Sequence, residues 1–128
     1  MARGAREEEL RAGPLSVFPA GYTARASGAV IPLTPREFEL LVELMRRPDE
    51  VLARTLLYER CWGHEMDPAD RAVDVYVRKL RAKLDHALPG WRFIHTHYRL
   101  GYRFSVQQID EAPDGARDTA DTVLEVEA

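Results

Sequence analysis

The chain has 128 residues, enough for one compact domain with short flanking segments. Its 45% hydrophobic and 30% charged residues exclude a fibrous or wholly disordered protein. No apolar run approaches the roughly 20 residues that span a bilayer, and the first ten residues are charged rather than apolar. We therefore expect no membrane segment and no signal peptide, and we place the protein in the cytoplasm.

The net charge of −3 is unevenly distributed along the chain. From Ser105 to Ala128, seven acidic residues stand against one arginine, a net charge of −6 that leaves +3 for everything before this segment. A mildly basic body with an acidic tail is compatible with DNA binding but does not require it.

Residues 1–9 are predicted to be a linker, and the segment after them has the pattern of a small antiparallel sheet. Short apolar stretches alternate with Gly, Pro and Ser residues, which is typical of strands joined by tight turns. We predict strands at Leu15–Phe18, Tyr22–Arg25 and Ala29–Leu33.

Two helices are predicted next. Thr34–Glu37 has the capping-box pattern, with proline at the first helical position, and it predicts a helix from Pro35 to Arg47. Its apolar residues recur on one face that we expect to be buried: Phe38, Leu41, Val42 and Met45. A second helix is predicted at Arg54–Trp62, with Gly63 as its stop. Its inward residues are expected to be Leu57, Cys61 and Trp62.

The third helix is predicted to begin at Asp67-Pro68-Ala69-Asp70, to span about residues 68–85 and to end near Leu84–Ala87. At 100° per residue, one narrow stripe must be buried: Val73, Val77, Leu80 and Leu84. The opposite face holds Arg71, Val75, Arg78, Lys79 and Ala82.

The C-terminal part of the domain has the pattern of a hairpin, with strands at Trp91–Thr96 and Gly101–Val106 joined by His97–Leu100. From Gln107 onward the chain is acidic and poor in aromatic residues, which predicts disorder. Within that tail, Thr122–Val126 has the pattern of an edge strand. The predicted organisation is thus a linker, one domain at residues 10–106 and a tail at 107–128.

A basic outer face of an amphipathic helix is usually just a solvated surface. The composition of this outer face favours DNA binding instead. It carries the small or apolar residues Ala72, Val75 and Ala82, which suit a major groove because they contact thymine methyl groups and allow close approach. The following hairpin carries Tyr98 and Arg99 at its tip, beside two histidines. A basic hairpin next to a groove-reading helix is a wing.

The segment Asp70–Leu84, followed by Gly101-Tyr102-Arg103-Phe104, resembles the OmpR/PhoB-type effector domain of bacterial response regulators. Leu33–Phe38 and Trp62-Gly63 fit the same pattern, and the resemblance extends from about Leu10 to Phe104. It implies an α+β winged helix-turn-helix fold with an N-terminal four-stranded antiparallel sheet, a three-helix bundle and a C-terminal β-hairpin wing. It also implies sequence-specific binding to double-stranded DNA as a transcription regulator of a two-component system. The third helix would lie in the major groove and the wing, residues 93–104, at the minor groove.

The resemblance implies a set of site residues and partners. The positions that contact bases are Arg71, Val75, Arg78 and Lys79. The positions that contact the DNA backbone are Arg54, Trp62, Arg81 and Thr96. The wing residues are His97, Tyr98 and Arg99. The loop that touches RNA polymerase in activators of the family is Gly63, His64, Glu65 and Met66. Two copies are expected to bind head to tail, as a homodimer on direct repeats.

The chain departs from the family pattern at three places. Ala53 occupies a position where the family commonly has a serine that caps the second helix, at an expected cost of about 1 kcal/mol. Tyr98-Arg99 replaces the usual Arg-Gly pair of the wing. No phosphoacceptor receiver domain is expected, because too few residues precede Leu10 to form one. The chain is therefore either a fragment of a longer regulator or a protein that is regulated differently.

Other functions are less well supported by the sequence. The pairs Cys61/His64 and His95/His97 lie on separate elements, whereas structural zinc requires four ligands, usually with more than one cysteine. No phosphate loop or nucleophile elbow is present, so we predict no enzyme activity, no cofactor and no metal. The main alternative is a winged-helix protein-interaction module, in which Asp74 and the acidic tail weaken the basic face. The tail itself is either a solubilising end or a flexible cover for the third helix.

Overall fold

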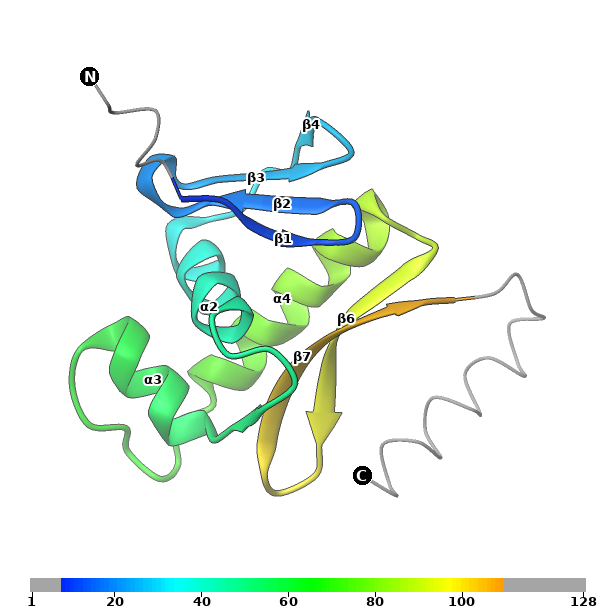
Figure 1. Cartoon of the computed structure of the whole chain (residues 1–128). Helices are drawn as coiled ribbons and strands as arrows, with labels where there is room; N and C mark the ends of the chain where they lie inside the picture. Colours follow the sequence, from blue (N-terminus) through cyan, green and yellow to red (C-terminus); the bar gives the residue numbers. More distant parts are fainter. Residues whose placement is uncertain (1–7, 110–128) are drawn as a thin grey trace.

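The computed structural model of the protein describes residues 8–109 (Figure 1). The chain forms a four-stranded sheet, then three helices interrupted by one short strand, and finally a long hairpin. This is the α+β architecture that the sequence predicts. The predicted edge strand at Thr122–Val126 and all of the predicted disorder after Ile109 lie outside the described residues, as do the first seven residues of the predicted linker.

The N-terminal sheet is antiparallel, and its strands follow one another in the order β1-β2-β3-β4. The strands are β1 (Leu10–Ala12), β2 (Leu15–Phe18), β3 (Thr23–Ala26) and β4 (Ala29–Val30), with the short 3-10 helix η1 (Pro19–Gly21) between β2 and β3. The prediction for β2 is confirmed. β3 begins one residue later than predicted because Tyr22 adopts a left-handed conformation, with φ of 49°. β4 is shorter than the predicted strand at Ala29–Leu33.

The first two helices are α2 (Pro35–Met45) and α3 (Arg54–Trp62). Both partners of the Thr34–Glu37 capping box are in place, as the sequence predicts. The helix ends before the predicted Arg47, since a residue that precedes proline disfavours the helical conformation and Pro48 follows. α3 has the predicted bounds, ends at Gly63 with φ of 83°, and has no side-chain cap at Ala53.

The start of the third helix, α4 (Ala72–Ala87), differs from the prediction. Asp67–Asp70 forms a turn, in which the Asp70 amide donates to the Asp67 carbonyl at 2.8 Å and the Ala69 amide to the Asp67 carboxylate at 2.9 Å. Asp70 then accepts a hydrogen bond from the Ala72 amide at 2.7 Å. Asp67 therefore stabilises a turn, and it is Asp70 whose side chain bonds to the first residue of the helix. The sequence pattern did not separate these roles, because aspartate stabilises turns as readily as helix starts. The predicted end near Ala87 is confirmed.

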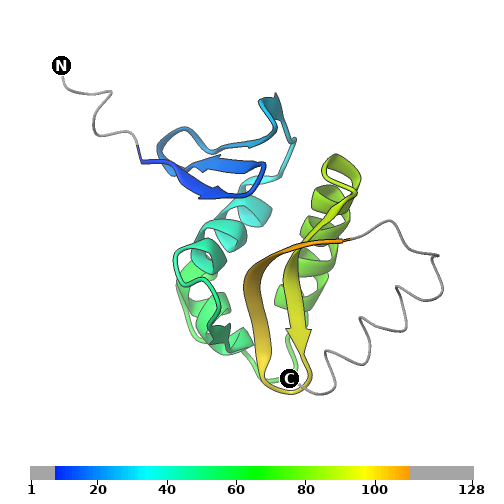
Figure 2. The same cartoon turned by 45° about the vertical axis from the view of Figure 1, so that its right-hand side comes forward.

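The C-terminal sheet has three strands in the order β5-β7-β6. They are β5 (Val51–Leu52), β6 (Trp91–His97) and β7 (Gly101–Gln108). The hairpin is as predicted, but β6 includes His97, which was predicted to be in the loop. β7 continues through Gln107 and Gln108, so the disorder predicted from Gln107 is wrong for these two residues. β5 lies between α2 and α3 along the chain and pairs with Tyr102 and Arg103 of β7, directly after the hairpin turn. This pairing fastens the turn end of the hairpin to the segment that leads into α3, as the path of the chain shows (Figures 1 and 2). Among residues 8–109, no helix has both the length and the apolar character that a membrane crossing requires.

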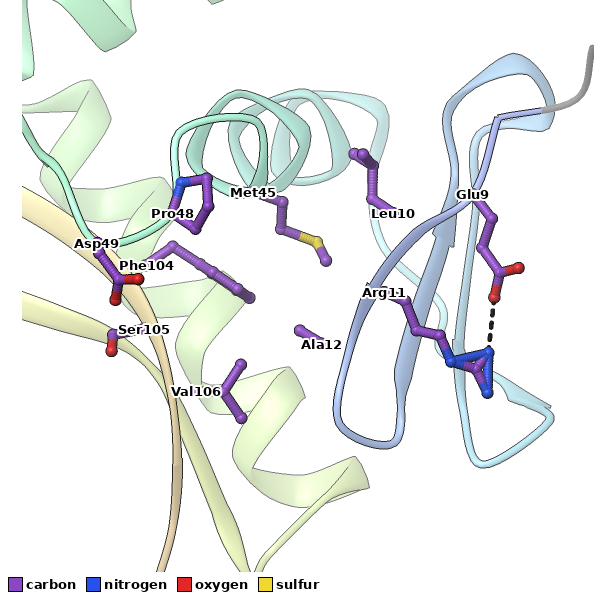
Figure 3. Close-up of a pocket in the computed structure, with 10 residues that line it drawn as sticks. All are labelled: Glu9, Leu10, Arg11, Ala12, Met45, Pro48, Asp49, Phe104, Ser105 and Val106. Carbon is purple, nitrogen blue, oxygen red and sulfur yellow. Dashed lines mark hydrogen bonds and ion pairs between the residues drawn. The ribbon is translucent and has the colours of Figure 1, made fainter.

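A hollow of about 390 Å³ lies between β1, the end of α2 and β7 (Figure 3). Its wall is formed mainly by apolar side chains, with the Glu9–Arg11 ion pair at 2.9 Å on one side. None of the residues that line it belongs to the set predicted to contact DNA. The hollow lies where the N-terminal sheet and the C-terminal sheet approach each other.

A buried ion pair joins α2 to α4. The Glu37 side chain is 1% exposed, and one of its oxygens accepts hydrogen bonds from the Lys83 ammonium at 2.7 Å and from the Thr34 amide at 2.9 Å. Burial alone would raise the pKa of the Glu37 carboxyl, but the hydrogen bonds from Lys83 and Thr34 outweigh burial and lower it below 4.5. The capping box of α2 therefore also anchors the third helix.

We predict that Lys83→Met lowers the free energy of unfolding by about 2–3 kcal/mol at pH 7, because the Glu37 carboxylate then stays buried without its cation. The pKa of Glu37 is lower in the folded than in the unfolded state, so the pair stabilises the fold above about pH 4.5 and this contribution is lost as pH falls through the folded-state pKa. Urea unfolding at pH 7 and at successively lower pH measures both effects. Lys79→Met, at an exposed lysine of the same helix, should change stability by less than about 0.5 kcal/mol. Equal losses for the two variants would contradict the prediction.

Candidate nucleic-acid interface

The two faces of α4 are divided as the sequence predicts, except that Ala72, which was predicted to lie on the outer face, is half-buried against the core. The stripe Val73, Val77, Leu80 and Leu84 is at most 2% exposed. On the opposite side Arg78 and Lys79 are exposed, the Arg71 side chain is 73% exposed, and Val75 is half-buried. No other part of residues 8–109 covers this basic face, so it is accessible to a partner along its length.

The tip of the wing is the turn between β6 and β7, at the end of the hairpin (Figure 2). Tyr98 is 76% exposed, and the Arg99 guanidinium lies over its ring at 5.2 Å from the centroid. Arg99 has a positive φ of 66°, which the turn requires. The tip therefore presents an aromatic ring and a cation together.

His97 is not at the surface, contrary to its predicted place in the exposed wing. It is the last residue of β6, it pairs with Gly101 of β7, and it is only 5% exposed. Thr96 contacts Arg81 of α4, so alternation along the strand places His97 on the other face of the hairpin, where it is nevertheless buried. Direct contact between its side chain and DNA is therefore not expected.

A cavity of about 600 Å³ opens between the start of α3, the start of α4 and the wing. It brings together residues that were predicted to contact bases, the backbone and the minor groove, although they are far apart in sequence. Among the residues that line it are Arg54, Met66, Arg71, Thr96, Tyr98 and Arg99. Three arginines and the carboxylate of Asp74 are therefore part of its lining.

At the wall of this cavity Asp74 joins three elements. Its carboxylate lies 3.5 Å from the Arg54 guanidinium and 3.6 Å from that of Arg71, and it accepts a hydrogen bond from the Tyr102 hydroxyl at 2.6 Å. Burial and this bond to Asp74 both raise the pKa of Tyr102. Sequence reasoning assigned no role to Tyr102 and treated Asp74 only as a charge that weakens the basic face. The spacing of Tyr102 from Phe104, two residues on and also buried, indicates that it faces inward.

Arg81 and Thr96 were both predicted to contact the DNA backbone, and the structure brings them together. The Arg81 guanidinium donates to the Thr96 hydroxyl at 3.0 Å and to the Ile94 carbonyl at 3.2 Å. These bonds tie α4 to β6, so Arg81 also holds the hairpin on the helix.

Trp62 belongs to an aromatic cluster between α3 and α4. Its ring stacks on Tyr58 at 4.7 Å between centroids and meets the edge of Tyr76 at 5.6 Å, with the Arg36 guanidinium 4.5 Å away. Trp62 thus has a packing role besides its predicted contact with DNA. In the loop that follows, Gly63, His64 and Glu65 are exposed and Met66 is half-buried.

The cysteine and histidine pairs do not form a metal site in the structure. Across residues 8–109 no three side chains among His, Cys, Asp and Glu are close enough to hold an ion. Cys61 is half-buried, as expected, and burial raises its pKa to about 12, so its thiol stays protonated at neutral pH.

Three helices beside a hairpin, with an exposed basic third helix, define a winged helix-turn-helix domain. The family model "Transcriptional regulatory protein, C terminal" matches residues 28–104, and the chain belongs to this family. The resemblance to OmpR/PhoB-type effector domains is thereby confirmed.

Individual relatives agree with this assignment. The chain is 38% identical to the transcriptional regulatory protein PrrA of Mycobacterium tuberculosis over 100 residues, which cover 78% of this chain and 42% of PrrA. The DNA-binding domain of Klebsiella pneumoniae RstA, solved in complex with the RstA box, has a TM-score of 0.69 and 28% identity, over 77% of this chain and 97% of that one. For the DNA-binding domain of Escherichia coli CpxR the TM-score is 0.70, with 28% identity and coverage of 77% and 96%. The chain spans less than half the length of the curated relatives that it matches.

Proposed function

We propose that this chain is the DNA-binding effector domain of a two-component transcription regulator and that it binds double-stranded DNA with sequence preference. The observation that carries the proposal is the uncovered outer face of α4, where Arg71, Arg78 and Lys79 lie side by side with the apolar Val75. Small apolar and basic side chains on one face suit the major groove. The relative RstA, with the same fold, is described in complex with its DNA box.

In this proposal α4 enters the major groove and the hairpin tip lies at the adjacent minor groove. Arg71, Val75, Arg78 and Lys79 contact bases. Arg54, Trp62, Arg81 and Thr96 position the DNA backbone, and Tyr98 and Arg99 contact the minor groove. Arg54 lies on the same cavity as the wing tip, which supports its assignment to a phosphate between the two grooves.

The remaining partners follow from the family. We propose head-to-tail binding of two copies on direct repeats and contact between RNA polymerase and the loop Gly63–Met66. The place of action is the cytoplasm, where bacterial DNA lies, and we assign the chain no catalytic role.

Selection of bound sequences from a random DNA pool tests the function. We expect enrichment of a defined motif, with direct repeats about 10–11 base pairs apart if two copies bind. Affinity for the selected site should fall steeply as salt increases, because phosphate contacts release counterions. No enrichment together with salt-independent behaviour would instead support the protein-interaction module.

The roles of the arginines and lysines predict two kinds of binding defect. Arg78→Ala or Lys79→Ala should weaken binding to the selected site by about 1–3 kcal/mol and relax base preference, while Arg54→Ala should weaken selected and random DNA alike. Fluorescence anisotropy with both duplexes measures the difference. Arg11→Ala, an exposed arginine on β1, is the matched control and should change neither affinity. Equal loss on both duplexes for all three variants would contradict the assignment.

A further inference from the structure

We propose that Asp74 is a positioning residue that sets how strongly the domain distinguishes its own site from other DNA, by holding Arg54 and Arg71 in fixed positions. The inference rests on the proposed DNA binding and deepens it. It gives a role to an acidic residue on a face where a negative charge, by itself, opposes the approach of phosphates.

The geometry around Asp74 is that of an anchored carboxylate. One oxygen accepts the Tyr102 hydroxyl at 2.6 Å, on the side of β7. The other oxygen is 3.5 Å from Arg54 Nη1 and 3.6 Å from Arg71 Nη1. Arg54 begins α3 and Arg71 immediately precedes α4, so one carboxylate fixes the relative position of two helix starts and the hairpin.

Several features hold this carboxylate in place. Asp74 lies in the first turn of α4, where the helix dipole favours a negative charge. Tyr102 is 7% exposed, and its hydroxyl stays protonated at neutral pH because burial and Asp74 raise its pKa. The Asp74 side chain is 27% exposed, so its outer oxygen remains close to the surface where phosphates would lie.

Two arginines with a fixed carboxylate partner behave differently on the two kinds of DNA. On random DNA the protein is held by phosphates alone, and a paired arginine gains less from a phosphate because it already has a carboxylate beside it. On the proper site, base contacts fix the position of α4, and arginines that are already oriented lose less conformational freedom on binding. Asp74 therefore weakens binding to random DNA more than binding to the proper site.

The test is Asp74→Asn, which removes the charge and keeps the shape of the side chain. Dissociation constants are measured for the selected duplex and for a random duplex of equal length, over a range of salt concentrations. We expect random-DNA affinity to rise about threefold to tenfold at low salt, with a salt slope steeper by up to about 1, equivalent to one additional phosphate contact. The ratio of specific to random affinity should fall about tenfold. An unchanged ratio would overturn the inference.

Two further variants separate charge from anchoring. Asp49→Asn removes the same charge from an exposed position outside the cavity that Asp74 lines, and it should leave the ratio unchanged. Tyr102→Phe keeps the carboxylate but removes its anchor; the ratio should fall while the salt slope on random DNA stays that of the wild type. If Asp49→Asn lowered the ratio as much as Asp74→Asn, net charge would explain the effect and the inference would fail.

The failures of the two proposals are distinguishable. A wild-type chain without sequence preference would overturn both the proposed function and the role of Asp74. Sequence preference in the wild type, with the same preference in a folded Asp74→Asn variant, would overturn the role of Asp74 alone. Thermal unfolding of each variant establishes that the fold is retained.

Discussion

Leu80→Asp is expected to unfold the domain. Leu80 is 0% exposed and lies on the buried stripe of α4, between Val77 and Leu84. A carboxylate at this position would be desolvated among apolar side chains. The expected loss is about 4–5 kcal/mol or more, comparable to the whole stability of a small domain. Far-ultraviolet circular dichroism and urea titration measure it.

The matched control is Lys79→Asp, one residue earlier on the exposed face. It introduces the same side chain into the same helix but leaves the core intact, so this variant should fold and lose affinity for DNA. A folded Leu80→Asp protein that merely failed to bind DNA would show that the helix is rotated differently from the structure described above.

Gly101→Ala is the second substitution with a large expected effect. A Cβ atom at this position would overlap the Leu52 carbonyl group, and Gly101 has φ of 143°, a conformation that residues with a side chain rarely adopt. The neighbouring atoms are backbone atoms of Leu52 and Ala53 and cannot turn aside. We expect a loss of about 3 kcal/mol or more, from steric overlap together with backbone strain.

Gly28→Ala is the control for Gly101→Ala. Gly28 also has a positive φ, 92°, but a Cβ atom there would meet nothing within 4 Å. This variant should therefore show strain without overlap, a loss of about 1 kcal/mol. Urea midpoints of the two variants give the comparison. If Gly101→Ala were no less stable than Gly28→Ala, the close contact between β5 and β7 would be absent in solution.

Much of the fold could be predicted because its signals are local. The capping box at Thr34 and Glu37, the stop at Gly63 and the apolar stripe of α4 each depend on residues within a few positions of one another. β5 could not be predicted, because a two-residue strand has no periodicity and exists through its pairing with β7, about fifty residues later. The start of α4 was misplaced for a related reason, since an aspartate before a proline is equally suited to a turn and to a helix cap.

The same distinction applies to the candidate site. The outer face of α4 could be predicted from the 3.6-residue period alone. The cluster around Asp74 could not, because Tyr102 is 28 residues away and only the packing of β7 against α4 brings its hydroxyl to the carboxylate. The burial of His97 could not be predicted either, because it depends on how the turn end of the hairpin packs and not on the alternation of residues along β6.

β5 ends directly before α3, at a point two residues from Arg54. Its pairing with β7 joins the beginning of α3 to the part of β7 that directly follows the hairpin turn. On DNA in the proposed orientation, the separation between the Arg54 contact and the wing tip would be set by the protein and not by the duplex. Such a fixed separation would favour duplexes whose groove width matches it. DNA shape would then contribute to selectivity at base pairs that no side chain touches.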